Sequence, residues 1–167
     1  MELELNRKSR LQIITGVRGV GKSTYCQRKI TEARREGKKV AGLLSTAQFR
    51  NKEKVGIEIE DVCTGERRSL ASTIPGSSND IRLGPWFFNT RTIAWGNEVL
   101  EKISFCDLLV VDEIGILEFD QAQGFTSAFK ILDKGEYILA IVVIRPEYLE
   151  RAKDRWPQSE EILIQVK

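Results

Sequence analysis

A glycine-rich stretch near the start of the chain carries the residue types and spacing that most directly indicate chemistry. Residues 16–23 read G-V-R-G-V-G-K-S and match the phosphate-binding pattern G-x-x-x-x-G-K-[ST] at every fixed position. The glycines let successive backbone N–H groups turn toward one concavity, and a helix that begins there adds the positive end of its dipole. The Lys22 ammonium can reach the β- and γ-phosphates of a nucleotide, and the Ser23 hydroxyl can ligate Mg²⁺. The sequence therefore predicts a nucleotide-binding loop, the P-loop, that consists of Gly16, Val17, Arg18, Gly19, Val20, Gly21, Lys22, Ser23 and Thr24.

Two adjacent carboxylates, Asp112 and Glu113, form the second half of the candidate site. They follow the apolar run Leu-Leu-Val-Val at residues 108–111, which predicts a buried strand that ends at Asp112. A carboxylate is costly to bury without a cation or hydrogen bonds, so Asp112 is predicted to reach the Mg²⁺ that Ser23 also ligates. Glu113 points differently and is the candidate to orient and activate a water molecule for attack on the γ-phosphate. The candidate catalytic residues are therefore Glu113 and Lys22, and the candidate metal ligands are Ser23 and Asp112.

Helices and parallel strands must bring these two motifs together. A short apolar run predicts a buried strand before the P-loop, and the residues from Lys22 to Glu36 predict a helix that ends at Gly37. A second buried strand over 39–45 completes a strand–helix–strand unit, which implies an α/β fold with a parallel sheet and a right-handed crossover. Similar patterns predict further strands over 107–111, 137–144 and 161–166, and helices over 93–102, 120–132 and 146–155.

The segment between the strand over 39–45 and the helix over 93–102 follows a different pattern. Residues 54–62 read K-V-G-I-E-I-E-D-V, and this alternation of apolar and polar residues predicts a half-exposed strand. Thr64 and Gly65 supply a turn, and residues 67–71 are a candidate return strand. We therefore expect a β-hairpin over about 49–72, inserted at the strand ends or at the sheet edge. Residues 72–80 are expected to form a loop, and residues 81–89 one more short strand.

Length, composition and charge limit the kinds of protein that this chain can be. The chain has 167 residues, of which 41% are hydrophobic and 30% charged, and these values predict one globular domain over residues 1–167. With 26 Lys and Arg against 24 Asp and Glu, the formal net charge is +2, so charge gives no reason to expect a nucleic-acid or membrane partner. The sequence shows no apolar run of transmembrane length and no signal peptide, which predicts a soluble, cytoplasmic protein whose three cysteines are reduced.

The sequence contains no histidine. This absence excludes a Ser-His-Asp triad, a Cys-His pair and a histidine-ligated metal. A general base in this protein must therefore be a carboxylate, a lysine or a bound water molecule.

Several stretches together resemble the small P-loop nucleoside-triphosphatases, a family first described from a thermophile and with a cancer-related relative in vertebrates. Besides the P-loop, these stretches are D-V-C-T-G-E at 61–66 and V-V-D-E-I-G-I-L-E at 110–118. The family's D-E-I-G signature falls on residues 112–115, and its following acidic position falls on Glu118. The likeness extends from about Leu11 to Val166.

The resemblance implies a RecA-like fold, which is a three-layer sandwich with a mostly parallel central sheet. It also implies Mg²⁺-dependent hydrolysis of ATP, GTP and other nucleoside triphosphates to the diphosphate and phosphate, with slow turnover. In such an enzyme Asp112 would assist Mg²⁺ and Glu113 would serve as the base. The nucleoside triphosphate is the partner that the resemblance implies, and the sequence names no protein partner.

The chain departs from the family pattern at two places. Many relatives carry a polar or histidine-containing motif after the strand that follows the acidic strand, whereas this chain has Ile-Arg-Pro at 144–146. Relatives also tend to have a V-G-R-Y-type sequence before the middle helix, whereas this chain has G-P-W-F-F-N at 84–89, flanked by Arg82 and Arg91. Since an arginine can stabilise charge on a transferring phosphoryl group, Arg82, Arg91 and Arg145 are the candidate phosphate sensors.

Three other functions are compatible with a P-loop. A GTPase should show an N-K-x-D guanine-binding motif after the acidic strand, but the one Asn-Lys pair lies before it, at 51–52, and its fourth residue is Lys54. A small-molecule or nucleotide kinase would use the same loop and pass the γ-phosphate to an acceptor. A nucleotide-gated binding module would bind the triphosphate tightly without turnover and use its hairpin to engage a partner.

Overall fold

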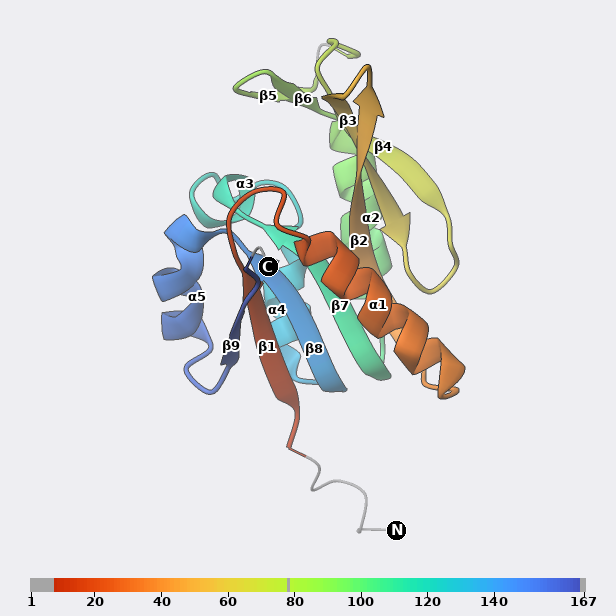
Figure 1. Ribbon diagram of the computed structural model, residues 1–167, viewed down its shortest axis with the longest axis vertical. Coiled ribbons are helices and arrows are strands. Elements are labelled where there is room, and N and C mark those ends of the chain that lie inside the picture. Colours follow the sequence, from red (N-terminus) through yellow and green to blue (C-terminus); the bar gives the residue numbers. More distant parts are fainter. Residues whose placement is uncertain (1–7, 78, 166–167) are drawn as a thin grey trace.

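The most apolar stretches of the sequence form parallel strands at the centre of the molecule. The computed structural model describes residues 8–77 and 79–165, and within them nine strands form one sheet in the order β5-β6-β4-β3-β2-β7-β8-β1-β9 (Figure 1). Runs of Val, Ile and Leu are typical of strands that helices cover on both faces. The parallel strands are β1 (Arg10–Thr15), β2 (Val40–Arg50), β7 (Cys106–Ile114), β8 (Tyr137–Ile144) and β9 (Glu160–Leu163).

The other half of the sheet is antiparallel. Four of the eight neighbouring strand pairs in the described residues are parallel, and the four that lie beyond β2 are antiparallel. The expectation of a mostly parallel sheet is therefore not confirmed, because the sheet is evenly mixed. The antiparallel strands are β3 (Glu53–Asp61), β4 (Arg67–Ser72), β5 (Ile81–Leu83) and β6 (Trp86–Phe88).

Strand β2 joins the two halves. Its first residues pair in parallel with β7, from Val40 opposite Leu108 onward, and its later residues pair antiparallel with β3. The strand was expected over 39–45 and continues to Arg50. Asn51 and Lys52 then close a two-residue turn with φ angles of 49° and 66°, the geometry that suits the twist of a tight hairpin. The two strands expected within 49–72 are present as an antiparallel pair, and they extend the main sheet from β2.

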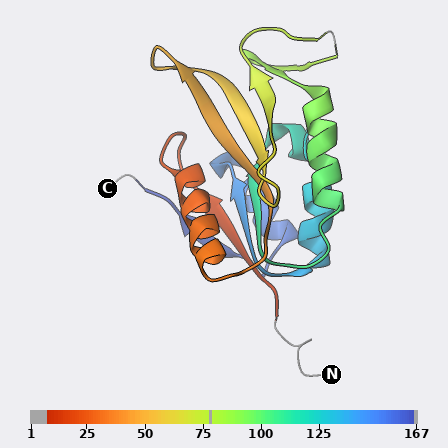
Figure 2. The same cartoon turned by 90° about the vertical axis from the view of Figure 1, so that its right-hand side faces the viewer.

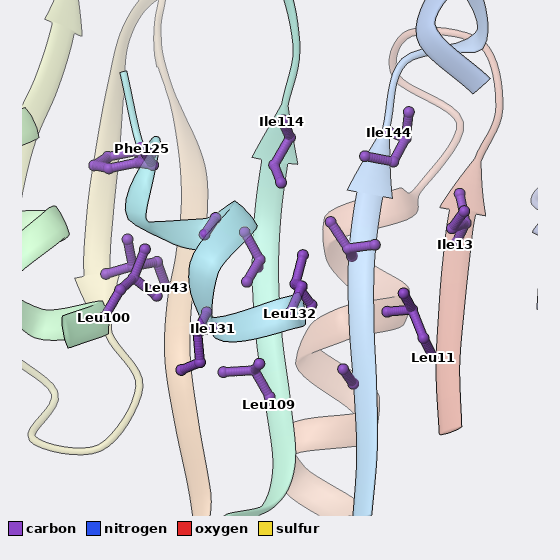
Figure 3. Packing of buried hydrophobic residues seen from close by; sticks show 14 of the residues in the cluster. Leu11, Ile13, Leu43, Leu100, Leu109, Ile114, Phe125, Ile131, Leu132 and Ile144 are labelled. Carbon is purple, nitrogen blue, oxygen red and sulfur yellow. The ribbon is translucent and has the colours of Figure 1, made fainter. Parts of the chain in front are cut away.

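Helices cover both faces of the parallel strands, which gives three layers (Figure 2). Helix α1 (Lys22–Arg35) lies on one face, where Cys26 and Ile30 pack among residues such as Ile14 and Val110. Helices α2 (Thr90–Glu101) and α4 (Ser127–Lys134) lie on the other face, where Leu100 and Leu132 belong to a larger cluster with Leu109 (Figure 3). Apolar side chains therefore fill the space on both sides of the sheet.

The prediction of a helix over 120–132 is wrong for the first half of that range. The chain instead forms the short helix α3 (Ile116–Phe119), then an irregular stretch, then α4. Ala122 and Gly124 in this stretch have φ angles of 50° and 72°, which a right-handed helix does not accommodate. The apolar spacing alone could not show this break, because it reports the buried face and not the backbone conformation.

Smaller differences concern the ends of elements. Residues 81–89 contain two strands, β5 and β6, because Gly84 turns the chain with a φ angle of 59°. Helix α2 begins at Thr90, and its cap is the side chain of Asn89, whose Oδ1 accepts from the N–H groups of Arg91 and Thr92. The helix expected over 146–155 consists of a 3-10 turn, η1 (Pro146–Tyr148), and α5 (Leu149–Arg155).

The remaining expectations concern the termini and the bilayer. The last predicted strand, 161–166, is present as β9 up to Leu163, and residue 166 lies outside the described part of the chain, as do residues 1–7 of the predicted domain. No helix within residues 8–77 and 79–165 is long and apolar enough to cross a membrane.

Candidate active site

The P-loop connects β1 to α1 at the carboxyl end of the parallel strands. Gly19 and Gly21 have φ angles of 75° and 106°, which only glycine adopts without strain. Within the described residues no side chain caps the first turn of α1, so its N–H groups remain free to bind an anion. The Lys22 Nζ donates to the carbonyl oxygens of Gly16 and Val17 at 2.6 and 3.2 Å, which holds its ammonium over the loop.

Asp112 lies against the start of α1, although 89 residues separate it from Ser23 in the sequence. The Ser23 hydroxyl donates to Asp112 Oδ2 at 2.8 Å, and the Ser45 N–H donates to the same oxygen at 3.3 Å. The Asp112 side chain is buried, with the residue only 2% exposed. Burial, with a smaller contribution from the Glu113 charge, raises the pKa of Asp112 to about 7, although the Ser23 hydrogen bond lowers it.

The residues around Asp112 fit a magnesium site in which the protein supplies two ligands. Mg²⁺ prefers oxygen ligands and is usually held by one or two protein groups together with phosphate oxygens and water. The Ser23 hydroxyl and the buried Asp112 carboxylate are two such oxygen ligands, already in contact. No group of three or more acidic, cysteine or histidine side chains in residues 8–77 and 79–165 could hold a metal ion by itself. A nucleotide would therefore have to supply the remaining ligands.

Glu113 is held by an arginine that follows the next parallel strand. Arg145, directly after β8, donates from Nε to Glu113 Oε1 at 2.6 Å. The Glu113 side chain is 36% exposed, so its second carboxylate oxygen can accept another hydrogen bond. Of the three candidate sensor arginines, the structure brings Arg145 to the acidic pair.

The other two candidate arginines lie elsewhere. Arg82, in β5, is exposed, donates to the Gly84 carbonyl oxygen and lies over the Phe87 ring. Arg91 is exposed in the first turn of α2. Neither belongs to the residues that line the cavity beside Asp112 within the described part of the chain. The structure therefore gives no support to a sensor role for either residue.

A cavity of about 150 Å³ adjoins the acidic pair. Its polar end is formed by Ser23, Ser45, Lys54, Asp112, Glu113 and Arg145. Its apolar walls come from the antiparallel strands, α2 and the segment after β7, namely Ala47, Ile57, Leu70, Leu83, Phe88, Ile93, Ile116, Leu117 and Phe125. Sequence reasoning missed Ser45, at the end of the strand expected over 39–45, and Lys54, which reaches the site because β3 extends the sheet. The one feature of the sequence that could have indicated Ser45 is that a polar residue follows directly after the apolar run of a buried strand.

Glu118, the family's second acidic position, organises the segment after β7. It is buried, and its two oxygens accept from the N–H groups of Gly115 and Phe125, both at 3.1 Å. Burial raises the pKa of Glu118, while these two hydrogen bonds lower it. The carboxylate thus ties both ends of the stretch from Gly115 to Phe125, which forms one wall of the cavity.

We expect Glu118→Ala to lower the free energy of unfolding by about 2–3 kcal/mol, because it leaves two buried N–H groups without acceptors. Urea denaturation of the variant and of Glu98→Ala, an exposed glutamate on α2, measures the difference. A loss no larger than that of Glu98→Ala would contradict the role of Glu118 in holding this segment.

The fold and the site together define an α/β protein whose glycine-rich loop has the sequence pattern of a P-loop. A glycine-rich loop follows a buried strand and begins a helix, and it contacts an aspartate at the end of a second parallel strand, with one strand between the two. The sequence model of the family described as NTPase matches residues 12–162. The chain belongs to this family.

Individual relatives agree with this assignment. The nucleoside-triphosphatase THEP1 of Methanosarcina barkeri is 31% identical over 133 residues, which cover 77% of this chain and 74% of the relative. The nucleoside-triphosphatase THEP1 of Methanosarcina acetivorans is 33% identical over 133 residues, with coverage of 77% and 73%. The predicted membership of the small nucleoside-triphosphatase family is confirmed, and so is the prediction that the chain is an enzyme.

Solved structures show the same fold. The solution structure of a human cancer-related nucleoside triphosphatase superposes with a TM-score of 0.69 and 18% identity, covering 95% of this chain and 89% of the other. The crystal structure of THEP1 from the hyperthermophile Aquifex aeolicus gives a TM-score of 0.64 and 18% identity, with coverage of 94% and 90%. The prediction of an α/β fold is confirmed by both.

Proposed function

We propose that the protein hydrolyses ATP, GTP and other nucleoside triphosphates to the diphosphate and phosphate in the presence of Mg²⁺. The observation that carries this proposal is the 2.8 Å hydrogen bond between Ser23 and Asp112, which joins the P-loop to the acidic strand. It places the two candidate metal ligands side by side at the helix N-terminus that would receive the phosphates. The RecA-like arrangement proposed for the fold is supported by the position of β8 between β1 and β7.

The residues of the P-loop bind the triphosphate in this proposal. The free N–H groups at the start of α1 donate to phosphate oxygens, and Lys22 leaves its loop carbonyls to contact the β- and γ-phosphates. Ser23 and Asp112 would hold Mg²⁺, which when bound would supply positive charge beside the phosphates. These contacts fix the γ-phosphate beside the acidic pair.

Glu113 removes the proton from the attacking water molecule. Its Oε1 is occupied by Arg145, and its second oxygen is free to accept a hydrogen bond from water within the cavity. The water oxygen attacks the γ-phosphorus, its proton moves to Glu113, and the diphosphate leaves. Arg145 holds the carboxylate in place during this step.

Broad base tolerance is supported by the family. The names of the relatives specify a nucleoside triphosphate and no particular base. The polar side chains that line the cavity are hydroxyl, carboxylate and cationic groups, which suit phosphate, metal and water. Hydrolysis should therefore depend on the triphosphate more than on the nucleoside.

Phosphate release from ATP, GTP, CTP and UTP, with and without Mg²⁺, tests the proposal. We expect turnover of several triphosphates that is lost when EDTA removes Mg²⁺. The cavity beside Glu113 also has room for an acceptor molecule, so nucleoside diphosphate should be measured alongside phosphate. Equal amounts of the two products indicate hydrolysis, whereas diphosphate in excess of phosphate indicates a kinase. Tight binding without either product would contradict the proposal in favour of a binding module.

A further inference from the structure

Lys54 brings a positive charge from the antiparallel half of the sheet to the phosphate end of the site. It lies in β3, opposite Phe49 of β2, and lines the cavity together with Ser23, Asp112 and Glu113. In both views the hairpin of β2 and β3 continues past the level of the P-loop, in the direction in which the parallel strands end (Figures 1 and 2). The extension of β2 to Arg50 is what carries Lys54 to this position.

The Lys54 ammonium has no acidic partner in the described structure. Within residues 8–77 and 79–165, no carboxylate oxygen lies within the 4.0 Å of its Nζ that defines an ion pair. The Nζ instead lies 5.3 Å from the centroid of the Trp86 ring. Burial lowers the pKa of Lys54, and the nearby charge of Arg18 lowers it further, whereas Glu113 raises it. An anion bound in the cavity beside Lys54 would therefore be stabilised by its charge.

The other cations near the site are already engaged or exposed. Arg145 pairs with Glu113, and Lys22 bonds to the carbonyl oxygens of the P-loop. Arg18 is an exposed residue of the P-loop. Lys54 is therefore the cation of the cavity wall that remains available to an anion held beside Asp112.

We propose that Lys54 binds the γ-phosphate of the substrate and stabilises the charge that its oxygens carry in the transition state. This inference rests on the proposed function, since it assumes a triphosphate in the P-loop. Fixed cations around a transferring phosphoryl group lower the barrier because they need no reorganisation during the reaction. The antiparallel extension then has a role in the reaction, as the element that supplies this cation within the same chain.

A contact to the γ-phosphate predicts discrimination between triphosphate and diphosphate. The diphosphate has no γ-phosphate for Lys54 to bind, so loss of the lysine should weaken binding of the triphosphate and leave binding of the diphosphate unchanged. A residue that only supports the fold would affect both ligands alike. The ratio of the two dissociation constants therefore separates the two roles.

The test compares Lys54→Gln and Lys54→Arg with Lys52→Gln, a matched control that removes an exposed lysine from the same hairpin. For Lys54→Gln we expect kcat to fall about 10²-fold. We also expect its preference for the β,γ-imido analogue of ATP over ADP, measured with Mg²⁺ by calorimetry, to fall about tenfold or more. Lys54→Arg should recover kcat to within about tenfold of wild type, because it keeps the charge. Lys52→Gln should match wild type in kcat and in the dissociation constants of both ligands.

Two results would overturn the role of Lys54. One is an unchanged rate and an unchanged ligand preference in Lys54→Gln. The other is an equal loss of affinity for both ligands, together with a lower Tm and no recovery in Lys54→Arg. Failure of the proposed function gives a different pattern: wild type would release no phosphate, and the ligand preference of Lys54→Gln would still decide whether Lys54 contacts the γ-phosphate.

Discussion

Lys22→Ala should lower kcat/KM for nucleoside triphosphates by about 10³-fold or more, and it should weaken triphosphate binding at the same time. The ammonium is placed over the P-loop by its bonds to the carbonyl oxygens of Gly16 and Val17, where it can exchange these acceptors for phosphate oxygens. A charge-assisted hydrogen bond to the ground state contributes about 1.5–3 kcal/mol, and the charge on the transferring group makes the contact stronger in the transition state.

The effect on binding and the effect on rate are measured separately. Calorimetry with the β,γ-imido analogue of ATP gives the affinity, and single-turnover phosphate release gives the rate of the chemical step. Lys130→Ala, which removes an exposed lysine from α4, controls for the loss of one positive charge. If Lys22→Ala retained wild-type affinity and rate, the glycine-rich loop would not be the phosphate site, and the proposed function would fail with it.

The core of the site could be predicted from sequence because its residues lie next to strong local signals. The P-loop is a fixed pattern between an apolar run and a helix, and Asp112 follows an apolar run that reads as a buried strand. Carboxyl ends of parallel strands lie at the same edge of a sheet, so the two motifs were expected to meet, and the Ser23–Asp112 hydrogen bond shows that they do.

The antiparallel half of the sheet could not be predicted with the same accuracy. The length of β2 depends on its partners, since its residues after Ser45 are exposed and are held as a strand by pairing with β3. Lys54 comes to the site through this pairing, and no local pattern distinguishes it from any lysine at the start of an exposed strand. The break at Ala122 and Gly124 was missed for a related reason, because the hydrogen bonds of Glu118 and not the apolar spacing hold that segment.

Arg145 shows how a departure from a family pattern can be interpreted from the structure. The sequence offered three arginines as phosphate sensors, and only Arg145 follows a strand that neighbours β7. In the proposed mechanism its bond to Glu113 orients the carboxylate and leaves one oxygen free. The proposed role of Glu113 as the base therefore depends on Arg145, and the two residues should be tested together.

Glu113→Gln should cut kcat by about 10²–10⁴-fold and leave binding of the triphosphate nearly intact, as expected for the loss of a general base. Glutamine has the same shape as glutamate, and its carbonyl oxygen can still accept the hydrogen bond that Arg145 donates to Glu113 Oε1. It cannot take a proton from water, so the variant keeps the geometry of the site and loses the proton transfer.

The measurement that assigns this role combines the rate with the dependence on Mg²⁺. Because Ser23 and Asp112 are the proposed metal ligands, the Mg²⁺ concentration that supports half-maximal triphosphate binding should be the same in Glu113→Gln and in wild type. Glu98→Gln, on the exposed face of α2, controls for the removal of one carboxylate. Equal kcat values in Glu113→Gln and wild type would exclude Glu113 as the base. A fall in rate matched by an equal fall in triphosphate affinity would assign Glu113 to substrate binding, and the proton would then have to pass to another acceptor beside the γ-phosphate.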